Sequence, residues 1–308
     1  MATRISELYT LPLDDWIEVV VKEWLVPNFR PAFQALQWPI EQVLGGLEAL
    51  LLWLPYPVFV LLVPLIAWRA AGSRVAIFAL ATVLFLDLLG IWRETMITLS
   101  MIITAVAFCV MVGVPLGILA ARSDRFAALI RPVLDIMQTI PPFVYLVPIV
   151  MLFGVGIVPG VIATIIFALP PMIRLTNLGI RQVQAELIEA GLAFGASRRQ
   201  LLFEIQIPLA LRTIMAGLNQ TLMLSLSMVV IAALIGAGGL GLTVFTGLGR
   251  LDIGRASLGG IGIVLLAILL DRVTQALGEG GHARTGGRRS FKRLLCQGLG
   301  KMRRDRAP

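Results

Sequence analysis

The chain has 308 residues, of which 58% are hydrophobic and 14% are charged, and its formal net charge is +8. Soluble proteins carry about 25% charged residues, so this composition, with a mean hydropathy of +0.90, excludes an ordinary soluble domain. It predicts an all-α polytopic membrane protein. The two cysteines and the single histidine have no metal-ligand spacing, so we expect neither a metal site nor a catalytic centre.

Residues 1–46 are predicted to form an external amphipathic segment at the N-terminus. Trp16, Trp24 and Trp38 lie among acidic residues, and tryptophan is enriched at membrane–water interfaces. A poorly ordered tail is the alternative. The segment lacks the basic-then-apolar pattern of a signal peptide, so the first span is expected to direct membrane insertion.

Long apolar stretches predict about seven transmembrane helices, at roughly 20 residues for each crossing. The stretch that begins at residue 129 is too long for one crossing, and Gly154 and Gly160 supply a turn within it. The first two spans occupy residues 47–93, and the other five occupy residues 94–278. The predicted spans are 49–68, 75–92, 96–121, 129–153, 158–177, 211–236 and 257–277.

The distribution of arginine predicts how these spans are oriented. Positive residues favour cytoplasmic loops, so an external N-terminus and an odd number of spans place most arginines, and the basic tail at 279–308, in the cytoplasm. A basic tail is also compatible with nucleic acid binding, but topology already accounts for its charge, and we expect no nucleic acid partner. The loop arginines on the predicted cytoplasmic side are Arg69, Arg74, Arg122, Arg125, Arg131, Arg174, Arg181, Arg198 and Arg199.

The stretch Glu186–Pro208 is predicted to form two short helices in a cytoplasmic loop. Its density of charge does not suit a bilayer core, and the apolar spacing in its first half indicates one helix. Gly195 then permits a turn. Ser197 and Gln200 predict a capping box that begins the second helix, and Pro208 is expected to end it.

Two helices presented in this way suit a groove on a partner protein, and an ordinary loop on the lipid headgroups is the alternative. The spacing resembles the EAA loop of binding-protein-dependent ABC importer permeases. The pattern in that family is Glu-Ala-Ala, three residues, Gly, nine residues, Ile, one residue and Leu-Pro. Here Gly191 takes the place of the second Ala, and Ile207 takes that of the Leu. The residues matched to the pattern are Glu189, Ala190, Gly191, Gly195, Ile205 and Pro208.

The resemblance extends along most of the chain. Runs that begin at Met137 (MQTIPPFVYLVPIVMLFG), Ile165 (IIFALPPMIRLT) and Asn219 (NQTLMLSLSMVVIAALI) are similar to the permease subunit of proline/glycine betaine importers. This implies a multi-pass protein of the bacterial inner membrane with the core of a type I ABC importer permease. Residues 94–278 would form the permease domain, preceded by two accessory transmembrane helices at 47–93.

The resemblance also implies partners. These are two ATPase subunits, a periplasmic substrate-binding protein and a second permease copy in a homodimer. The sequence has no G-x-x-x-x-G-K-[ST] phosphate-binding loop, so ATP and magnesium are expected in the ATPase subunits and no cofactor on this chain. The stretch Glu189–Gly195 would then be a coupling helix in a cleft of the ATPase. A G-x-G-x-x-G match at 236–241 follows a membrane helix instead of a strand, so we interpret it as a break in that helix.

Several polar and aromatic residues are candidates for a translocation pathway. In hydrocarbon, polar side chains need either another helix or an aqueous path, and the sequence leaves both open. Aromatic faces attract quaternary ammonium groups, which adds Phe143, Tyr145 and Trp92. Asp135 is expected to pair with Arg131 one turn earlier. The polar candidates on the sixth span are Asn219, Gln220 and Ser227, with Thr221 and Ser225 beside them.

The leading hypothesis is an ATP-driven importer of glycine betaine and proline betaine-type osmoprotectants. The same architecture could carry choline, carnitine or an amino acid, and the sequence does not decide among these. A secondary transporter is a more remote alternative, because the two halves of the chain share no repeated hydropathy pattern. A membrane-embedded enzyme would need a cluster of His, Cys or carboxylate residues, and the sequence suggests none.

Overall fold

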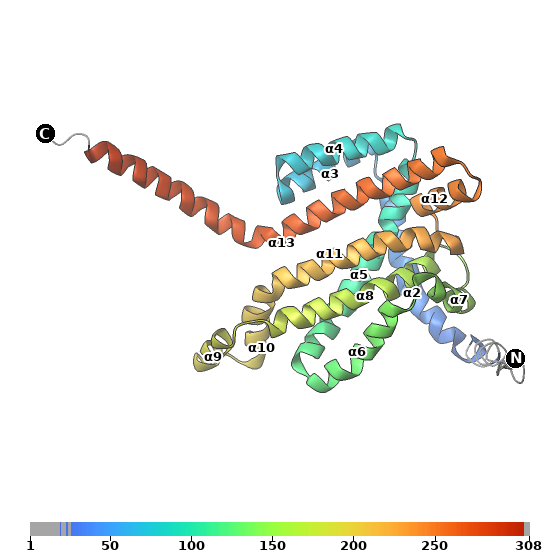
Figure 1. Ribbon diagram of the computed structural model, residues 1–308, viewed down its shortest axis with the longest axis horizontal. Helices are drawn as coiled ribbons and strands as arrows, with labels where there is room; N and C mark the ends of the chain where they lie inside the picture. The colour runs from blue at the N-terminus through green and yellow to red at the C-terminus, as the bar shows by residue number, and fades with distance from the viewer. Residues whose placement is uncertain (1–18, 20–22, 24–25, 305–308) are drawn as a thin grey trace, which may run out of the picture.

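The computed structural model describes residues 19, 23 and 26–304, and the surroundings of side chains are described as far as residue 278. Trp16 and Trp24 of the predicted interfacial segment lie outside the described residues. Within the described range the chain is helical and contains no strand, which confirms the all-α prediction. Figure 1 shows long helices lying side by side, with short helices at the two ends of the assembly.

The helices are α2 (Val26–Trp53), α3 (Tyr56–Ala71), α4 (Ser73–Leu88), α5 (Trp92–Arg122), α6 (Asp124–Thr139), α7 (Pro142–Phe153), α8 (Ile157–Arg181), α9 (Ala185–Ala193), α10 (Arg198–Gln200), the π-helix η3 (Leu201–Gln206), α11 (Ile207–Ala232), the 3₁₀ turn η4 (Ala233–Ile235), α12 (Gly239–Gly249) and α13 (Ile253–Arg304). Four stretches are long and apolar enough to cross a membrane: α5, α8, Arg198–Ile235 and the 253–278 part of α13.

The predicted spans at 49–68 and 129–153 each contain a sharp bend. The first is split between α2 and α3, which meet at 109°, and the second between α6 and α7, which meet at 101°. Proline removes a backbone donor and clashes with the turn before it, and Pro55 and Pro141 occupy the N-caps of α3 and α7. Counting each bent pair as one span gives up to six. The span predicted at 75–92 corresponds to α4, whose 16 residues extend only about 24 Å.

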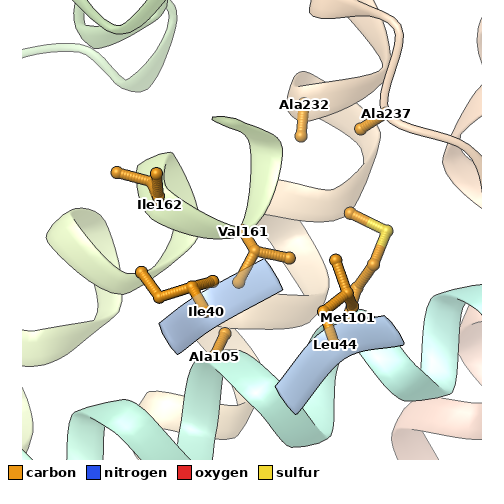
Figure 2. Packing of buried hydrophobic residues seen from close by; sticks show 8 residues of the cluster. All are labelled: Ile40, Leu44, Met101, Ala105, Val161, Ile162, Ala232 and Ala237. Carbon is orange, nitrogen blue, oxygen red and sulfur yellow. The ribbon is translucent and has the colours of Figure 1, made fainter. Parts of the chain in front are cut away.

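The boundary predicted at residue 46 does not coincide with an end of a helix, because α2 continues to Trp53. Ile40 and Leu44 of α2 are buried against Met101 of α5 and Val161 of α8. Figure 2 shows these side chains converging from separate helices, with Ala232 and Ala237 nearby. The second half of the predicted external segment is therefore packed onto the core by its apolar face.

The core is built from α5, α8 and α11, which have the most extensive mutual contacts of the long helices. Small residues let helix backbones approach closely. A Cβ atom at Gly117 of α5 would lie 2.5 Å from Cβ of Thr176 on α8, and one at Gly179 of α8 would lie 2.9 Å from Cβ of Thr213 on α11. The three helices are therefore tightly packed against one another.

The glycine-rich segment after α11 is a turn, as predicted. Gly236 adopts a left-handed conformation with φ of 80°, which ends the helical run. The amide of Leu240 then donates to Oγ1 of Thr98 on α5 at 2.8 Å. The amide at the start of α12 is thus satisfied within the protein.

Figure 1 places α9 and α10 at one end of the molecule, which we call the loop side. The α3–α4 and α5–α6 corners lie toward the same end, whereas α12 and the α7–α8 corner lie at the opposite end, the far side. The corners on the loop side carry Arg69, Arg74, Arg122 and Arg125. The arginines that the sequence assigns to one face of the membrane are therefore gathered at one end of the fold.

Candidate functional site

The first helix of the predicted coupling loop, α9, ends in a defined cap. The amide of Gly195 donates to the carbonyl of Leu192 at 2.9 Å, and that of Ala196 donates to the carbonyl of Gly191 at 3.0 Å. This pair of bonds is the Schellman motif. It requires a left-handed residue, and Gly195 has φ of 81°. The turn predicted at Gly195 is confirmed, and its geometry sets the angle between α9 and the next helix.

Gly191 is the point at which α9 touches the helix that follows. Its backbone is buried, and a Cβ atom there would lie 2.7 Å from Cδ1 of Ile205 and 3.0 Å from Cδ1 of Leu201. The glycine that departs from the Glu-Ala-Ala pattern therefore lets α9 sit directly on η3. Ile205, another residue of the pattern, supplies the opposing surface.

The second helix begins as predicted and ends differently. Ser197 and Gln200 form the reciprocal capping box, with bonds of 3.3 and 2.9 Å. Pro208, however, does not end the helix, because Arg198–Ile235 runs on as one helical stretch of 38 residues. The wide π turn η3 ends two residues before Pro208, and the Ile207 amide donates to the carbonyl of Leu202. This looser turn accommodates the proline ring that would clash in an α-helix.

The outer surface of the loop combines apolar and charged side chains. Phe194 is 92% exposed at the tip, and Leu192 and Phe203 are more than half exposed. Glu189 and Ala190 are also exposed on α9. Large exposed apolar side chains rimmed by charge are typical of a protein–protein contact. The exposed residues of this surface are Glu186, Leu187, Glu189, Ala190, Leu192, Phe194, Arg198, Arg199 and Phe203.

The loop is continuous with an arginine network between α6 and α8. Arg181 at the end of α8 reaches Asp124 at 2.7 Å, the carbonyl of Ala120 at 2.8 Å and Oδ1 of Asn177 at 2.8 Å. It thereby joins the end of α5 and the start of α6 to α8, and three residues separate Arg181 from α9. All of its nitrogen groups have partners.

The ion pair predicted between Asp135 and Arg131 is wrong. Asp135 instead pairs with Arg174 of α8 at 2.6 Å, and Arg174 also donates to Gln138 at 2.6 Å. Planar guanidinium groups bind two acceptors at once, so Arg174 holds both Asp135 and Gln138 of α6. Both ion pairs are partly exposed, so they position α6 more than they stabilise it.

The predicted pathway residues do not form one cluster. Asn219 accepts a hydrogen bond of 3.2 Å from Thr274 on α13, which favours the helix–helix interpretation. The hydroxyl of Tyr145 donates to the carbonyls of Ile136 and Met137 at the end of α6, so it braces the α6–α7 bend. Phe143 is 60% exposed on α7.

Trp92 is half-buried and packs against two other aromatic rings. Its ring lies edge-to-face with those of Tyr56 and Phe59, at centroid distances of 5.1 and 5.2 Å. Edge-to-face contact is a favoured packing arrangement for aromatic side chains. The three rings therefore lock the start of α5 to the start of α3.

Gln220 and Ser227 remain exposed, and they belong to a longer surface that sequence reasoning missed. They lie seven positions apart on α11, so they share a helical face. The opposite faces of α11 are buried by α5, α8 and α13. The exposed stripe, which we call the α11 stripe, consists of Leu209, Arg212, Ala216, Gln220, Met223 and Ser227. Its spacing was visible in the sequence, but only the packing of the other helices shows that it is left uncovered.

Comparison with known proteins agrees with this architecture. The family described as "Binding-protein-dependent transport system inner membrane component" matches residues 113–280. Two chains of the inward-facing MetNI methionine ABC transporter have the same fold. One aligns with a TM-score of 0.54 and 22% identity, covering 61% of this chain and 93% of that chain. At this identity the likeness concerns the fold alone.

Curated relatives are much more similar. The chain is 56% identical over 281 residues to the glycine betaine/proline betaine permease protein ProW of Escherichia coli, covering 91% of this chain and 79% of the relative. It is 42% identical over 271 residues to the glycine betaine permease protein OpuAB of Bacillus subtilis, covering 88% and 96%. A glycine betaine/carnitine permease protein of Listeria monocytogenes is 43% identical over 278 residues, covering 88% and 96%. The chain belongs to the family of inner membrane permease components of binding-protein-dependent ABC importers.

Proposed function

We propose that this chain is the permease subunit of an ATP-driven importer of glycine betaine and proline betaine. The observation that carries the proposal is the 56% identity over 281 residues to the glycine betaine/proline betaine permease of Escherichia coli. The identity spans the core helices, the loop and the accessory helices together. Choline, carnitine or an amino acid remains the second candidate substrate class, because a relative at 43% identity is a carnitine as well as a betaine permease.

The geometry of the loop supports coupling to a separate ATPase. The surface with exposed Phe194 and Leu192 is compact and capped at both turns, so it can enter a groove without first becoming ordered. Behind it, Arg198–Ile235 is one helical stretch of 38 residues. A rigid helix carries a displacement at one end to the other. The ATPase subunits, two in the complete assembly, would bind ATP and magnesium and move the core helices through this stretch.

The α11 stripe supports a homodimer. Arg212, Gln220 and Ser227 are exposed along a helix whose other faces are buried. Polar side chains in a membrane helix need protein or water as a neighbour. A second copy of the chain that approaches this stripe would supply both, with the translocation pathway running between the two α11 helices. Phe143, which is exposed on α7, would lie beside that pathway.

The distribution of arginines between the two ends of the fold supports an orientation of the chain in the membrane. The loop side, with Arg122, Arg125 and Arg181, would face the cytoplasm under the positive-inside rule, together with the basic C-terminal tail. The far side, with α12 and the α7–α8 corner, would face the periplasm together with the N-terminus. The periplasmic substrate-binding protein would therefore dock on the far side and deliver the substrate to the end of the pathway.

Uptake by the reconstituted complex tests the function. We expect labelled glycine betaine to enter proteoliposomes only with the ATPase subunit, the binding protein and ATP present. A nonhydrolysable ATP analogue is the matched control. Unlabelled proline betaine, carnitine and choline as competitors then rank the substrates. Uptake driven by an ion gradient without ATP would overturn the proposal.

A further inference from the structure

A cavity of about 350 Å³ lies where the accessory helices meet the core. It is bounded by the end of α2, by α3 and α4, and by α5 and α13. Contact between α4 and α5 is sparse, whereas α3 and α4 contact each other and α13 closely. The cavity therefore lies between the α3–α4 hairpin and α5. Its lining includes Leu62, Ile66, Val83, Leu86, Met96, Leu99 and Leu266.

The surface of the cavity is entirely apolar. Thr95 is its one hydroxyl-bearing residue, and that hydroxyl already donates to the carbonyl of Ile91 at 2.8 Å. A water molecule needs at least two polar partners to be stable in a buried site. The cavity does not offer two such partners, so water is not stable in it. If the cavity were empty, the residues that line it would lack dispersion contacts on that side.

The cavity also opens to the surface of the protein. Leu50 of α2 and Ile66 of α3 line it and are 53% and 51% exposed, while Met96 at its inner wall is 1% exposed. Leu61 and Leu65 continue the apolar surface along α3, at 73% and 56% exposed. In a protein of the inner membrane this surface faces hydrocarbon. None of the residues that line the cavity is on α11, and in Figure 1 the hairpin and α11 lie on different sides of α13.

We propose that this cavity is a binding site for one acyl chain of a membrane phospholipid. The chain would enter between α2 and α3, lie along Leu62 and Ile66, and reach Met96 and Leu99 of α5. A flexible hydrocarbon chain meets the three requirements of the site: it is apolar, it is present at the opening, and it can follow the bend between the two helices. The rim near Trp92 and Tyr56 matches the aromatic side chains found at the level of lipid headgroups.

The bound chain would join the hairpin to the core. Ala67, Ala79 and Leu269 hold one end of the hairpin to α13. Leu86, Ile91 and Leu240 hold the other end to α12 and the start of α5. The acyl chain would occupy the space between these two contacts. Lipid is thus expected to stabilise the position of α3 and α4 relative to α5.

Tryptophan fluorescence tests the proposal in the full chain. The contribution of Trp92 is obtained as the difference between the wild-type chain and Trp92→Phe. In bilayers of brominated phosphatidylcholine we expect strong quenching of that contribution. In Leu99→Phe, which fills the cavity, most of this quenching is expected to be lost. Ile77→Phe, on the outer face of α4 and 69% exposed, is the matched control and is expected to behave as wild type.

Native mass spectrometry provides an independent measurement. If Leu99→Phe fails to insert into the membrane, Val83→Phe fills the cavity in its place. We expect the wild-type chain and Ile77→Phe to retain a phospholipid in detergent, and the filled variant to lose it. Equal quenching and equal lipid retention in the filled and control variants would overturn the proposal. Quenching of Trp92 by iodide would also overturn it, since the cavity would then hold water. So would dimers cross-linked through cysteines placed at the opening.

Discussion

The contact between Gly191 and Ile205 leads to a prediction that tests the packing of α9 on η3 separately from the chemical character of the residue at position 191. A methyl group at residue 191 meets Cδ1 of Ile205 at 2.7 Å and Cδ1 of Leu201 at 3.0 Å. Both opposing atoms are the ends of flexible side chains, so Gly191→Ala is expected to cost about 1 kcal/mol in overpacking. Alanine gains about 1 kcal/mol over glycine in helix propensity. The two effects cancel, and we expect near wild-type behaviour.

Gly191→Leu is expected to separate α9 from η3. The added carbon atoms extend beyond a Cβ position that is already too close, and a cost of about 3 kcal/mol is at the upper end for overpacking. If the ATPase recognises the two helices as one unit, its affinity for the permease should fall roughly a hundredfold. The assay is binding of the purified ATPase subunit to the reconstituted permease, with the melting temperature as a check on folding.

Two further variants test whether lost packing between α9 and η3 causes the fall in affinity. Gly45→Leu makes the same substitution on α2, where nothing lies within 4 Å of the added atom, and it should leave binding unchanged. Gly191→Leu combined with Ile205→Ala removes the opposing side chain and should recover most of the affinity. Full binding by Gly191→Leu, or no recovery in the double variant, would refute the packing account.

Three other predictions follow from the described contacts. Phe194→Ser, at a side chain 92% exposed, should weaken ATPase binding at least tenfold (about 1.4 kcal/mol or more) with no change in melting temperature; a parallel loss of stability would contradict a surface role. Arg181→Met should destabilise the protein by about 1–2 kcal/mol in thermal unfolding, whereas Asp124→Asn should change stability by less than about 0.5 kcal/mol because that carboxylate is largely exposed; equal effects would contradict the proposed network. Ser227→Cys should form a disulfide-linked dimer on oxidation, and Ile77→Cys on the outer face of α4 should not; the reverse result would remove the α11 stripe from the dimer interface.

The loop was predictable where its signals are local. Gly195 and the pair Ser197 and Gln200 act through hydrogen bonds to residues within five positions, so their spacing alone predicts the two caps. Pro208 was mispredicted because its effect depends on the hydrogen-bonding register of the preceding turn. The π turn of η3 removes the clash, and no local propensity indicates a π turn.

Long-range contacts account for the other differences. Arg131 lies one turn from Asp135 in the sequence, but the carboxylate is taken by Arg174, which becomes its neighbour only when α6 packs on α8. The role of Asn219 could not be decided for the same reason, since its partner Thr274 is on α13. The bends within two predicted spans occur at prolines that are plain in the sequence, yet their angles of 109° and 101° depend on what the flanking helices pack against.

We propose that the loop containing Glu189 converts ATP hydrolysis in another subunit into movement of these helices. It is tested most directly by measuring ATP hydrolysis and betaine uptake together in proteoliposomes that contain Glu189→Arg. The exposed position of Glu189 makes this a change of the docking surface and not of the fold. We expect normal membrane insertion, loss of uptake and ATP hydrolysis that is no longer stimulated by substrate. Uptake and hydrolysis that remain coupled at the wild-type ratio would contradict it.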